Sequence, residues 1–363
     1  MSERFAAARA VLEQAIANRV SPGAVIEVGD TTRPLWIHAT GRLTYNPTAP
    51  LTDASTIFDL ASLTKVVSTA PLVMRQIARG ILGLDDPVSS HIERWRGDDR
   101  KSVTIRDLLA HASGLPAYRS LHTDHRGVDA YVEAISTLAL EYPARSAAVY
   151  SDLDFILLGA ILERMGPLGS QFEAMRTQMP IASELQFSPP ASWQRRTAPT
   201  RQSPERQRLL RGEVDDENAW ALGSIAGHAG LFGTASAVGE YARHLLQILD
   251  GRSGALDAGL LRTFISRRTE IPGSSRALAW DTMLPTSSCG SRMSPAAFGH
   301  TGFTGTSLWI DPDCRADPSG PAGIYVVLLT NRVHPVPGDA ALIRQVRRDV
   351  HDAVMDAVVP ANG

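Results

Sequence analysis

Strand-forming sequence is concentrated at the two ends of this 363-residue chain, and that distribution limits the folds it can adopt. Near the N-terminus, residues 24–28 and 35–39 flank a Gly-Asp-Thr-Thr turn and predict a hairpin. Near the C-terminus, residues 306–311 and 323–330 predict an antiparallel pair. Residues from 62 to about 250 have mainly helical spacing. We therefore expect an α+β fold, in which helices flank one antiparallel sheet built from both chain ends and the insertion between them is mostly helical.

The same pattern predicts how the chain divides into regions. Residues 1–61 and 252–363 are expected to form the sheet region and residues 62–251 the helical region, with an active site between them. A chain of this length can form one large domain or two closely joined ones with a substantial core. Residues 186–212 are rich in Pro, Arg and Gln, and we expect a lid or a mobile loop there.

Composition argues against several classes of function. A formal net charge of −2 gives no electrostatic basis for binding nucleic acid or an anionic membrane. No apolar run approaches the length of about 18 residues that a membrane span needs. Residues 1–20 carry charged side chains among short alanine runs, so they predict an amphipathic surface helix instead of a signal peptide. Cys289 and Cys314 lack metal-ligand spacing. We expect a cytoplasmic protein without a cofactor; the sequence leaves the oligomeric state open.

Ser62 and Lys65 are three residues apart at the start of an expected helix, which would place both side chains on one face. A serine hydroxyl becomes an effective nucleophile when a neighbouring base takes its proton, and a lysine whose pKa is lowered by burial can act as that base. Of the 36 Lys and Arg side chains, only Lys65 and Lys101 are lysines, and arginine cannot lose its proton near neutral pH. A chance match of this kind is expected about one time in seven, so other motifs must support it.

Two further motifs follow in the order expected for penicillin-recognising serine enzymes. Tyr-Ser-Asp occupies residues 150–152 and His-Thr-Gly occupies residues 300–302. Residues 105–116 and 227–232 add to the similarity, which extends over residues 22–331. The sequence resembles the class C β-lactamase-related family, which includes D-Ala-D-Ala carboxypeptidases, D-aminopeptidases and carboxylesterases. The resemblance implies the β-lactamase/transpeptidase-like version of the α+β fold.

The resemblance also implies catalytic roles. Ser62 would attack a carbonyl carbon to form an acyl-enzyme, which water then hydrolyses. Lys65 and Tyr150 would share the role of base, and which of them takes the serine proton is left open. The backbone N–H groups of Ser62 and Phe303 would form the oxyanion hole. The bulky ring of Phe303 would also narrow the cleft.

Two positions depart from the family pattern. Asp152 stands where the family more usually has Asn, and His300 stands where it has Lys. A carboxylate at position 152 would stabilise protonated Lys65 and repel an anionic substrate group, and it also suits the first turn of a helix. Histidine is mostly neutral at pH 7, so carboxylate recognition should be weaker than in a dedicated β-lactamase. Thr301 and Gly302 would complete the substrate-binding stretch, where glycine lets a substrate backbone approach.

Other polar residues have plainer explanations. His111 and His228 lie beside glycine-containing turns, and we expect them to be structural and not metal ligands. The acidic run within residues 213–217 is expected to be a solvated loop and not a cation site.

The leading hypothesis is a serine hydrolase that cleaves an ester or amide through a Ser62 acyl-enzyme. Its substrate would be a small ester, amide or peptide, such as a peptidoglycan-derived amide or a D-amino-acid peptide. One alternative is a true β-lactamase, against which Asp152 and His300 argue. The other is a catalytically silent penicillin-binding or scaffold protein, against which the intact Lys65 and Tyr150 argue.

Overall fold

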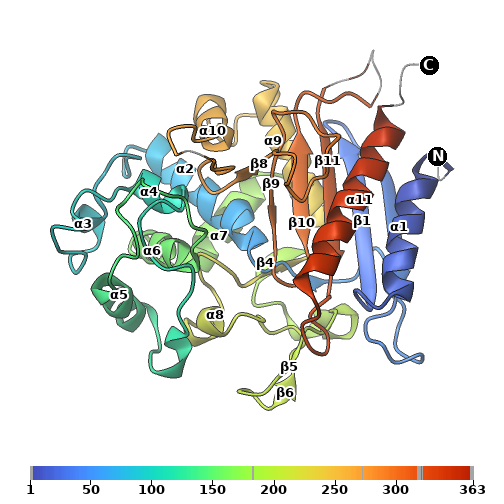
Figure 1. The fold of residues 1–363 in the computed structure, drawn as a ribbon, viewed down its shortest axis with the longest axis horizontal. Coiled ribbons are helices and arrows are strands. Elements are labelled where there is room, and N and C mark those ends of the chain that lie inside the picture. Colours follow the sequence, from blue (N-terminus) through green and yellow to red (C-terminus); the bar gives the residue numbers. More distant parts are fainter. Residues whose placement is uncertain (1–2, 182–183, 272, 317–319, 321, 360–363) are drawn as a thin grey trace.

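A six-stranded antiparallel sheet forms the centre of one half of the molecule (Figure 1). The computed structural model describes residues 3–181, 184–271, 273–316, 320 and 322–359. The strand order is β2-β1-β11-β10-β9-β8. The bounds are β1 (Gly23–Asp30), β2 (Pro34–Gly41), β8 (Asp281–Thr282), β9 (Phe298–Thr301), β10 (Ser307–Asp311) and β11 (Ile324–Thr330). The strands of both chain ends therefore lie in one sheet.

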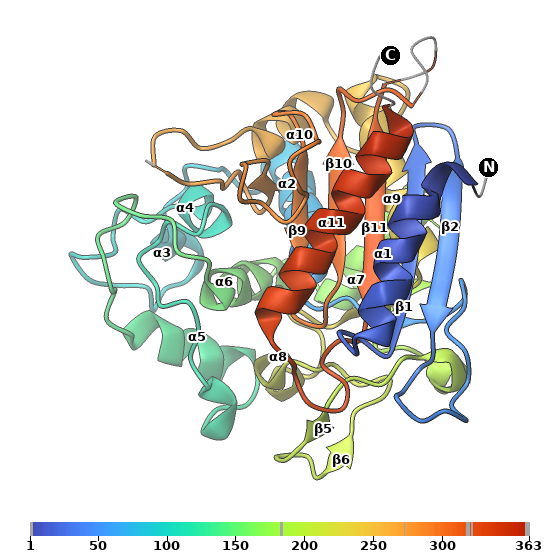
Figure 2. The same cartoon turned by 45° about the vertical axis from the view of Figure 1, so that its right-hand side comes forward.

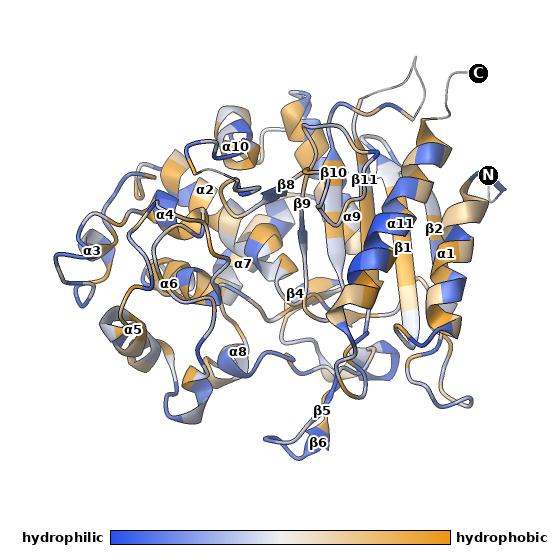
Figure 3. Ribbon diagram, in the orientation of Figure 1, coloured by the Kyte–Doolittle hydropathy of each residue, from blue (hydrophilic) through white to orange (hydrophobic). Residues whose placement is uncertain are grey.

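Both faces of this sheet are covered by helices, and β11 shows how the sequence achieves this. Successive residues of a strand point to opposite faces. The even-numbered residues of β11, beginning with Ile324, pack under α1 (Ala6–Ala17) and α11 (Ala340–Val358). The odd-numbered ones, beginning with Tyr325, belong to the core that contains α9 (Ala235–Leu249). Figure 2 shows α1 and α11 side by side on the same face, and Figure 3 shows the hydrophobic strands beneath α11.

The other half of the molecule is mainly helical and surrounds α6. Ten of the twelve residues of that helix are buried, and all of these except Asp154 are apolar. The helices are α2 (Ala70–Ala78), α3 (Val88–His91), α4 (Ile105–Leu109), α5 (Val128–Thr137), α6 (Asp152–Glu163), α7 (Leu168–Gln178), α8 (Glu217–Ala221) and α10 (Ala258–Ile265). Shorter helical elements are η1 (Glu3–Phe5), the π-helix η2 (Lys65–Thr69), η3 (Leu121–Thr123) and η4 (Ala191–Arg196). Two small sheets contain β3 (Phe58–Asp59), β7 (Leu231–Gly233) and β4 (Leu185–Phe187), and β5 (Gln202–Ser203) and β6 (Arg208–Leu209).

The predicted fold class is confirmed, and the β1–β2 hairpin and the β10–β11 pair are antiparallel as expected. The division at residues 61/62 and 251/252 stays a prediction. α9 lies within the predicted helical region, and it packs on the sheet. Within the described residues, no helix is both long and apolar enough to cross a membrane.

The segment 186–212, for which the sequence predicts a lid or a mobile loop, contacts the body of the protein through Arg206, and its mobility stays a prediction. Arg206 is buried, and it donates hydrogen bonds from Nε to Glu217 Oε2 at 2.8 Å and from Nη1 to the Val214 carbonyl at 2.7 Å. A buried arginine bound in this way fixes the β5–β6 hairpin that carries it.

The expectation of a solvated acidic loop at residues 213–217 is wrong. Asp215 and Glu217 are buried, and Arg201 lies 3.3 Å from the Asp215 carboxylate and 3.2 Å from that of Glu217. The physical reason is that arginines of the preceding hairpin fold back onto the acids, a pairing that the run of acidic residues does not itself reveal.

Candidate active site

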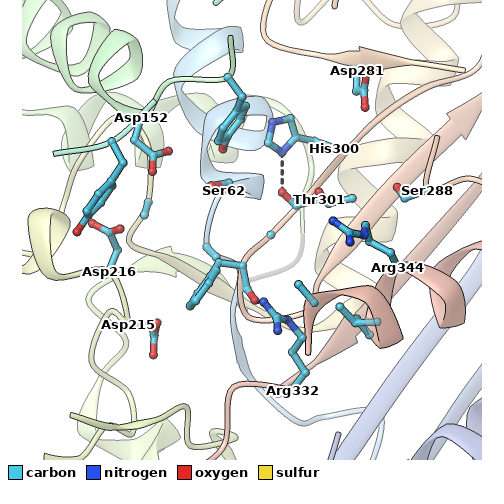
Figure 4. Close-up of a pocket in the computed structure, with 18 of the residues that line it drawn as sticks. Ser62, Asp152, Asp215, Asp216, Asp281, Ser288, His300, Thr301, Arg332 and Arg344 are labelled. Atoms are coloured by element: carbon cyan, nitrogen blue, oxygen red, sulfur yellow. Dashed lines mark hydrogen bonds between the residues drawn. The ribbon is translucent and has the colours of Figure 1, made fainter. Parts of the chain in front are cut away.

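A cleft of about 900 Å³ lies between the β9 end of the sheet and the helical half (Figure 4). It is lined by every sequence-predicted site residue except Lys65, namely Ser62, Tyr150, Asp152, His300, Thr301, Gly302 and Phe303. Lys65 is fully buried, and its Nζ atom touches the Ser62 hydroxyl. The chain segments before α2, before α6 and after β9 thus meet at one place.

Ser62 is presented by a sharp turn that follows β3. Ala61 adopts a left-handed conformation with φ of 48°, which is uncommon for a residue with a side chain. The Asp59 carboxylate holds this turn, because its Oδ1 atom accepts the Ala61 N–H at 2.8 Å. The chain then enters the π-helix η2, which begins at Lys65. π-Helical turns occur often at functional sites. The sequence predicts a regular helix here, so the π-helix is a difference from that expectation.

The Lys65 ammonium donates hydrogen bonds to three neighbouring oxygen atoms. Nζ donates to Ser62 Oγ at 2.9 Å, to Asp152 Oδ1 at 2.7 Å and to the His228 carbonyl at 3.1 Å. Burial alone lowers the pKa of Lys65, but the negative charge of Asp152, together with the hydrogen bonds to Asp152 and Tyr150, outweighs it, so the pKa of Lys65 is raised. In the resting protein Lys65 is therefore a charged donor to Ser62.

Tyr150 lies beside this ammonium, with its ring centroid 4.9 Å from Lys65 Nζ. Burial raises the pKa of Tyr150, and the charge and hydrogen bond of Lys65 oppose that rise without cancelling it. The resting side chain is therefore a neutral phenol. The Arg276 guanidinium lies over the same ring, 5.2 Å from its centroid.

The turn after β9 lies against the turn that carries Ser62. Thr304 Oγ1 donates to the Asp59 carbonyl at 2.8 Å, and Thr306 Oγ1 donates to the Leu60 carbonyl at 3.1 Å. Within the described part of the chain, neither the Ser62 nor the Phe303 N–H donates a hydrogen bond. Two linked turns thus offer two free N–H groups at the cleft, as an oxyanion hole requires.

Comparison with known proteins agrees with this geometry. The family model described as Beta-lactamase matches residues 8–350. The chain belongs to the β-lactamase family. The N-acetylmuramyl-L-alanine amidase of Bacillus subtilis strain 168 is 29% identical over 314 residues, which cover 77% of this chain and 68% of the relative. An Escherichia coli K12 protein provisionally named D-alanyl-D-alanine carboxypeptidase is 28% identical over 330 residues, or 78% and 71% of the two chains.

Among solved structures, EstCE1, a hydrolase with promiscuous acyltransferase activity, superposes with a TM-score of 0.72 at 20% identity. The match covers 96% of this chain and 99% of EstCE1, and at this sequence identity it shows that the two proteins share a fold. The predicted family, fold class and enzyme class, a β-lactamase-related hydrolase, are confirmed. The roles of individual residues in this β-lactamase family member stay predictions.

Three histidines surround the site. His300 is 2% exposed, its Nδ1 donates to the Thr301 carbonyl at 2.9 Å, and burial holds its pKa well below the usual range. His111 Nδ1 accepts the Ser151 N–H at 3.1 Å, and burial lowers the pKa of His111 likewise. His228 Nε2 lies 2.8 Å from Asp216 Oδ1. Among the residues that the structure describes, no cluster of His, Cys, Asp or Glu is arranged to hold a metal ion.

We expect Asp152→Asn to shift the acidic limb of the pH dependence of kcat/KM to lower pH. Burial has the largest effect on the pKa of both candidate bases, Lys65 and Tyr150. The charge of the Asp152 carboxylate has a further effect, and it raises both pKa values. Without this charge, either group loses its proton at lower pH, so the direction is the same whichever of them serves Ser62. The pH profile for a neutral ester measures the shift. Asp281→Asn is the control, because Asp281 lines the cleft away from Lys65; an unmoved limb in Asp152→Asn would contradict the expectation.

Sequence reasoning missed several cleft residues that have no place in the family motifs. Arg276, Arg332, Arg344 and Arg347 all line the cleft, and so does Asp216 of the acidic run, for which the sequence predicts a solvated loop. Of the four arginines, only Arg347 left a signal in the sequence. It lies on the buried face of α11 between Ile343 and Val350, at spacings of four and three residues, where the helical repeat otherwise places apolar side chains.

Proposed function

We propose that this protein hydrolyses an ester or amide through an acyl-enzyme on Ser62. The observation that carries the proposal is the contact of 2.9 Å between Ser62 Oγ and the fully buried Lys65 Nζ. A buried lysine is expensive to maintain, and the chain has only one other lysine. Its placement against a serine hydroxyl supports a role in moving the serine proton.

In the proposed reaction, the Ser62 oxygen bonds to the substrate carbonyl carbon while its proton passes into the Lys65–Tyr150 pair. The carbonyl oxygen becomes an oxyanion between the N–H groups of Ser62 and Phe303. The bond to the leaving group then breaks as the pair returns the proton to that group. Water repeats the sequence on the acyl-enzyme, which releases the acid and restores the Ser62 hydroxyl.

For the substrate, we propose an amide or ester derived from a peptide, with a peptidoglycan fragment or a D-amino-acid peptide as the leading class. The names of the B. subtilis and E. coli relatives support an amide. The volume of about 900 Å³ lies in the upper part of the usual range for small-molecule sites. Neutral His300 and the acidic Asp152 favour a substrate that is not held by a carboxylate, which argues against efficient β-lactam turnover.

The test is an acyl-enzyme screen on purified protein read by intact mass and peptide mapping. We expect a fluorophosphonate, activated esters and muramyl-peptide amides to add to Ser62, and nitrocefin to be hydrolysed slowly if at all. Failure of every probe to label Ser62 would refute the proposal. Rapid nitrocefin turnover would instead establish a true β-lactamase, and tight ligand binding without any labelling would favour a silent binding protein.

We also propose a cytoplasmic location. Cys289 and Cys314 are free and buried, as is usual for proteins of a reducing compartment. Fractionation of the producing cell would test this, and recovery from an extracytoplasmic fraction would contradict it.

A further inference from the structure

Arg347 is a buried cation without an acidic partner. It lies on α11, its side chain is 5% exposed, and no carboxylate among the described residues forms an ion pair with it. Burial, reinforced by the charges of Arg332 and Arg344, lowers the pKa of Arg347 to about 9, so the guanidinium remains charged at pH 7. An unpaired charge in the interior is strongly unfavourable. An apolar residue would continue the helical repeat at this position at no such cost, so the charge needs an explanation.

The contacts of Arg347 point to the turn after β9. Nη2 donates to the Gly302 carbonyl at 2.9 Å and to the Thr306 carbonyl at 2.8 Å. The Gly302 carbonyl and the Phe303 N–H belong to one peptide group. A cation bound to the oxygen of an amide draws electron density from its nitrogen, and hydrogen bonds in such a chain strengthen one another. The Phe303 N–H is therefore a stronger donor when Arg347 is in place.

Two further carbonyls of this turn accept hydrogen bonds from Arg332. Arg332 Nε donates to the Phe303 carbonyl at 2.9 Å, and the Arg332 N–H donates to that of Thr304 at 3.0 Å. Figure 4 shows Arg332 and Arg344 on the side of the cleft opposite Asp152 and Asp216. The arginines thus bind carbonyl oxygens of the turn, while in the described part of the chain the Phe303 N–H has no acceptor of its own.

We propose that Arg347 is a positioning residue of the oxyanion hole: it fixes the turn at residues 302–306 and polarises the Gly302–Phe303 peptide. Its effect on the reaction passes through the Phe303 N–H, which donates more strongly to the negatively charged tetrahedral intermediate than to the neutral carbonyl of the substrate. This inference rests on the proposed function, and it adds a residue that none of the family motifs contains.

The kinetic test compares Arg347→Met and Arg347→Lys with the matched control Arg348→Met. Arg348 lies on the same helix and donates to the carbonyls of Pro285 and Ser287, away from the turn. Rates are divided by the concentration of Ser62 that a fluorophosphonate labels at completion, which removes any loss of folded protein. Loss of one oxyanion donor typically costs about 10²–10³ in rate. We expect a weakened donor to reduce kcat about 10- to 100-fold in Arg347→Met, with KM little changed, and less in Arg347→Lys.

A boronic acid inhibitor provides the second kinetic measurement, because its adduct with Ser62 places a charged tetrahedral centre against the oxyanion hole. Its affinity should fall in Arg347→Met by the same factor as kcat/KM, and stay near the wild-type value in Arg348→Met. Unchanged boronate affinity and an unchanged rate per labelled Ser62 in Arg347→Met, with only thermal stability reduced, would overturn the inference and leave Arg347 a structural residue.

A spectroscopic measurement tests the same inference without any turnover. In protein labelled with ¹⁵N-Phe, the nine phenylalanine amides can be resolved, and Phe303→Leu assigns the one of interest. We expect Arg347→Met and Arg347→Lys to move the Phe303 amide resonance toward that of a weaker hydrogen-bond donor, and to move it more than any other Phe amide, whereas Arg348→Met should leave it in place. An unmoved Phe303 resonance would overturn the inference even in an active enzyme. A moved resonance in a protein that never acylates would uphold the polarisation and refute the proposed function instead.

Discussion

Ser62→Ala should abolish turnover and leave the fold intact. In the proposed mechanism, the Ser62 oxygen is the only protein atom that bonds covalently to the substrate. Removal of a comparable serine nucleophile from other enzymes lowers kcat by a factor on the order of 10⁶. Ser62 lies in a turn and precedes the helix, and the backbone bonds that shape this turn come from its neighbours. Ester and amide hydrolysis, together with intact mass after fluorophosphonate treatment, measure the effect.

Ser68→Ala is the matched control for this substitution. Ser68 is a buried serine in the π-helix that follows Ser62, and within the described residues its hydroxyl has no hydrogen-bond partner. Its removal should therefore change neither stability nor turnover appreciably. If Ser62→Ala retained hydrolysis at the rate of Ser68→Ala, another residue would be the nucleophile.

The sequence was sufficient to predict the parts of this site that depend on local spacing. Ser62 and Lys65 are separated by one helical turn, so their meeting is a property of the local chain. The β1–β2 hairpin is equally local, and it is present. The order of the motifs, through the resemblance, then indicated that Tyr150 and His300 would join them.

What the sequence could not supply are contacts between segments that only the tertiary fold brings together. The carbonyl oxygen that accepts a hydrogen bond from Lys65 belongs to His228, 163 residues away in the sequence. Because every residue has a backbone carbonyl, such a contact cannot be recognised from the residue type. The pairing of Arg206 with Glu217 depends on how the β5–β6 hairpin folds back. Arg347 was visible only as a charge on an apolar helix face, which by itself does not show what the charge binds.

Lys65→Met should remove most of the activity and also destabilise the protein, for two separable reasons. Loss of a positioned proton-transfer group typically costs about 10²–10⁴ in rate. The Asp152 carboxylate, which is 18% exposed, would lose its cation, and leaving such a group unsatisfied costs about 1–3 kcal/mol. Since the pKa of Lys65 is raised in the folded protein, the ion pair stabilises the wild type from neutral pH up to pH 10.5, and this contribution is lost as the pH rises further through the raised pKa.

The double variant Lys65→Met/Asp152→Asn separates the two effects. An amide at position 152 beside an apolar residue carries no uncompensated charge, so much of the lost unfolding free energy should return. Turnover should not return, because Tyr150, which is also hydrogen-bonded to Ser62, would lose the Lys65 cation that holds down its pKa and would then be a poor proton acceptor. Denaturant unfolding and single-turnover acylation measure the two quantities on the same samples. Recovery of acylation together with stability would show that Lys65 serves the fold of the Ser62 turn, and that Tyr150 alone moves the proton.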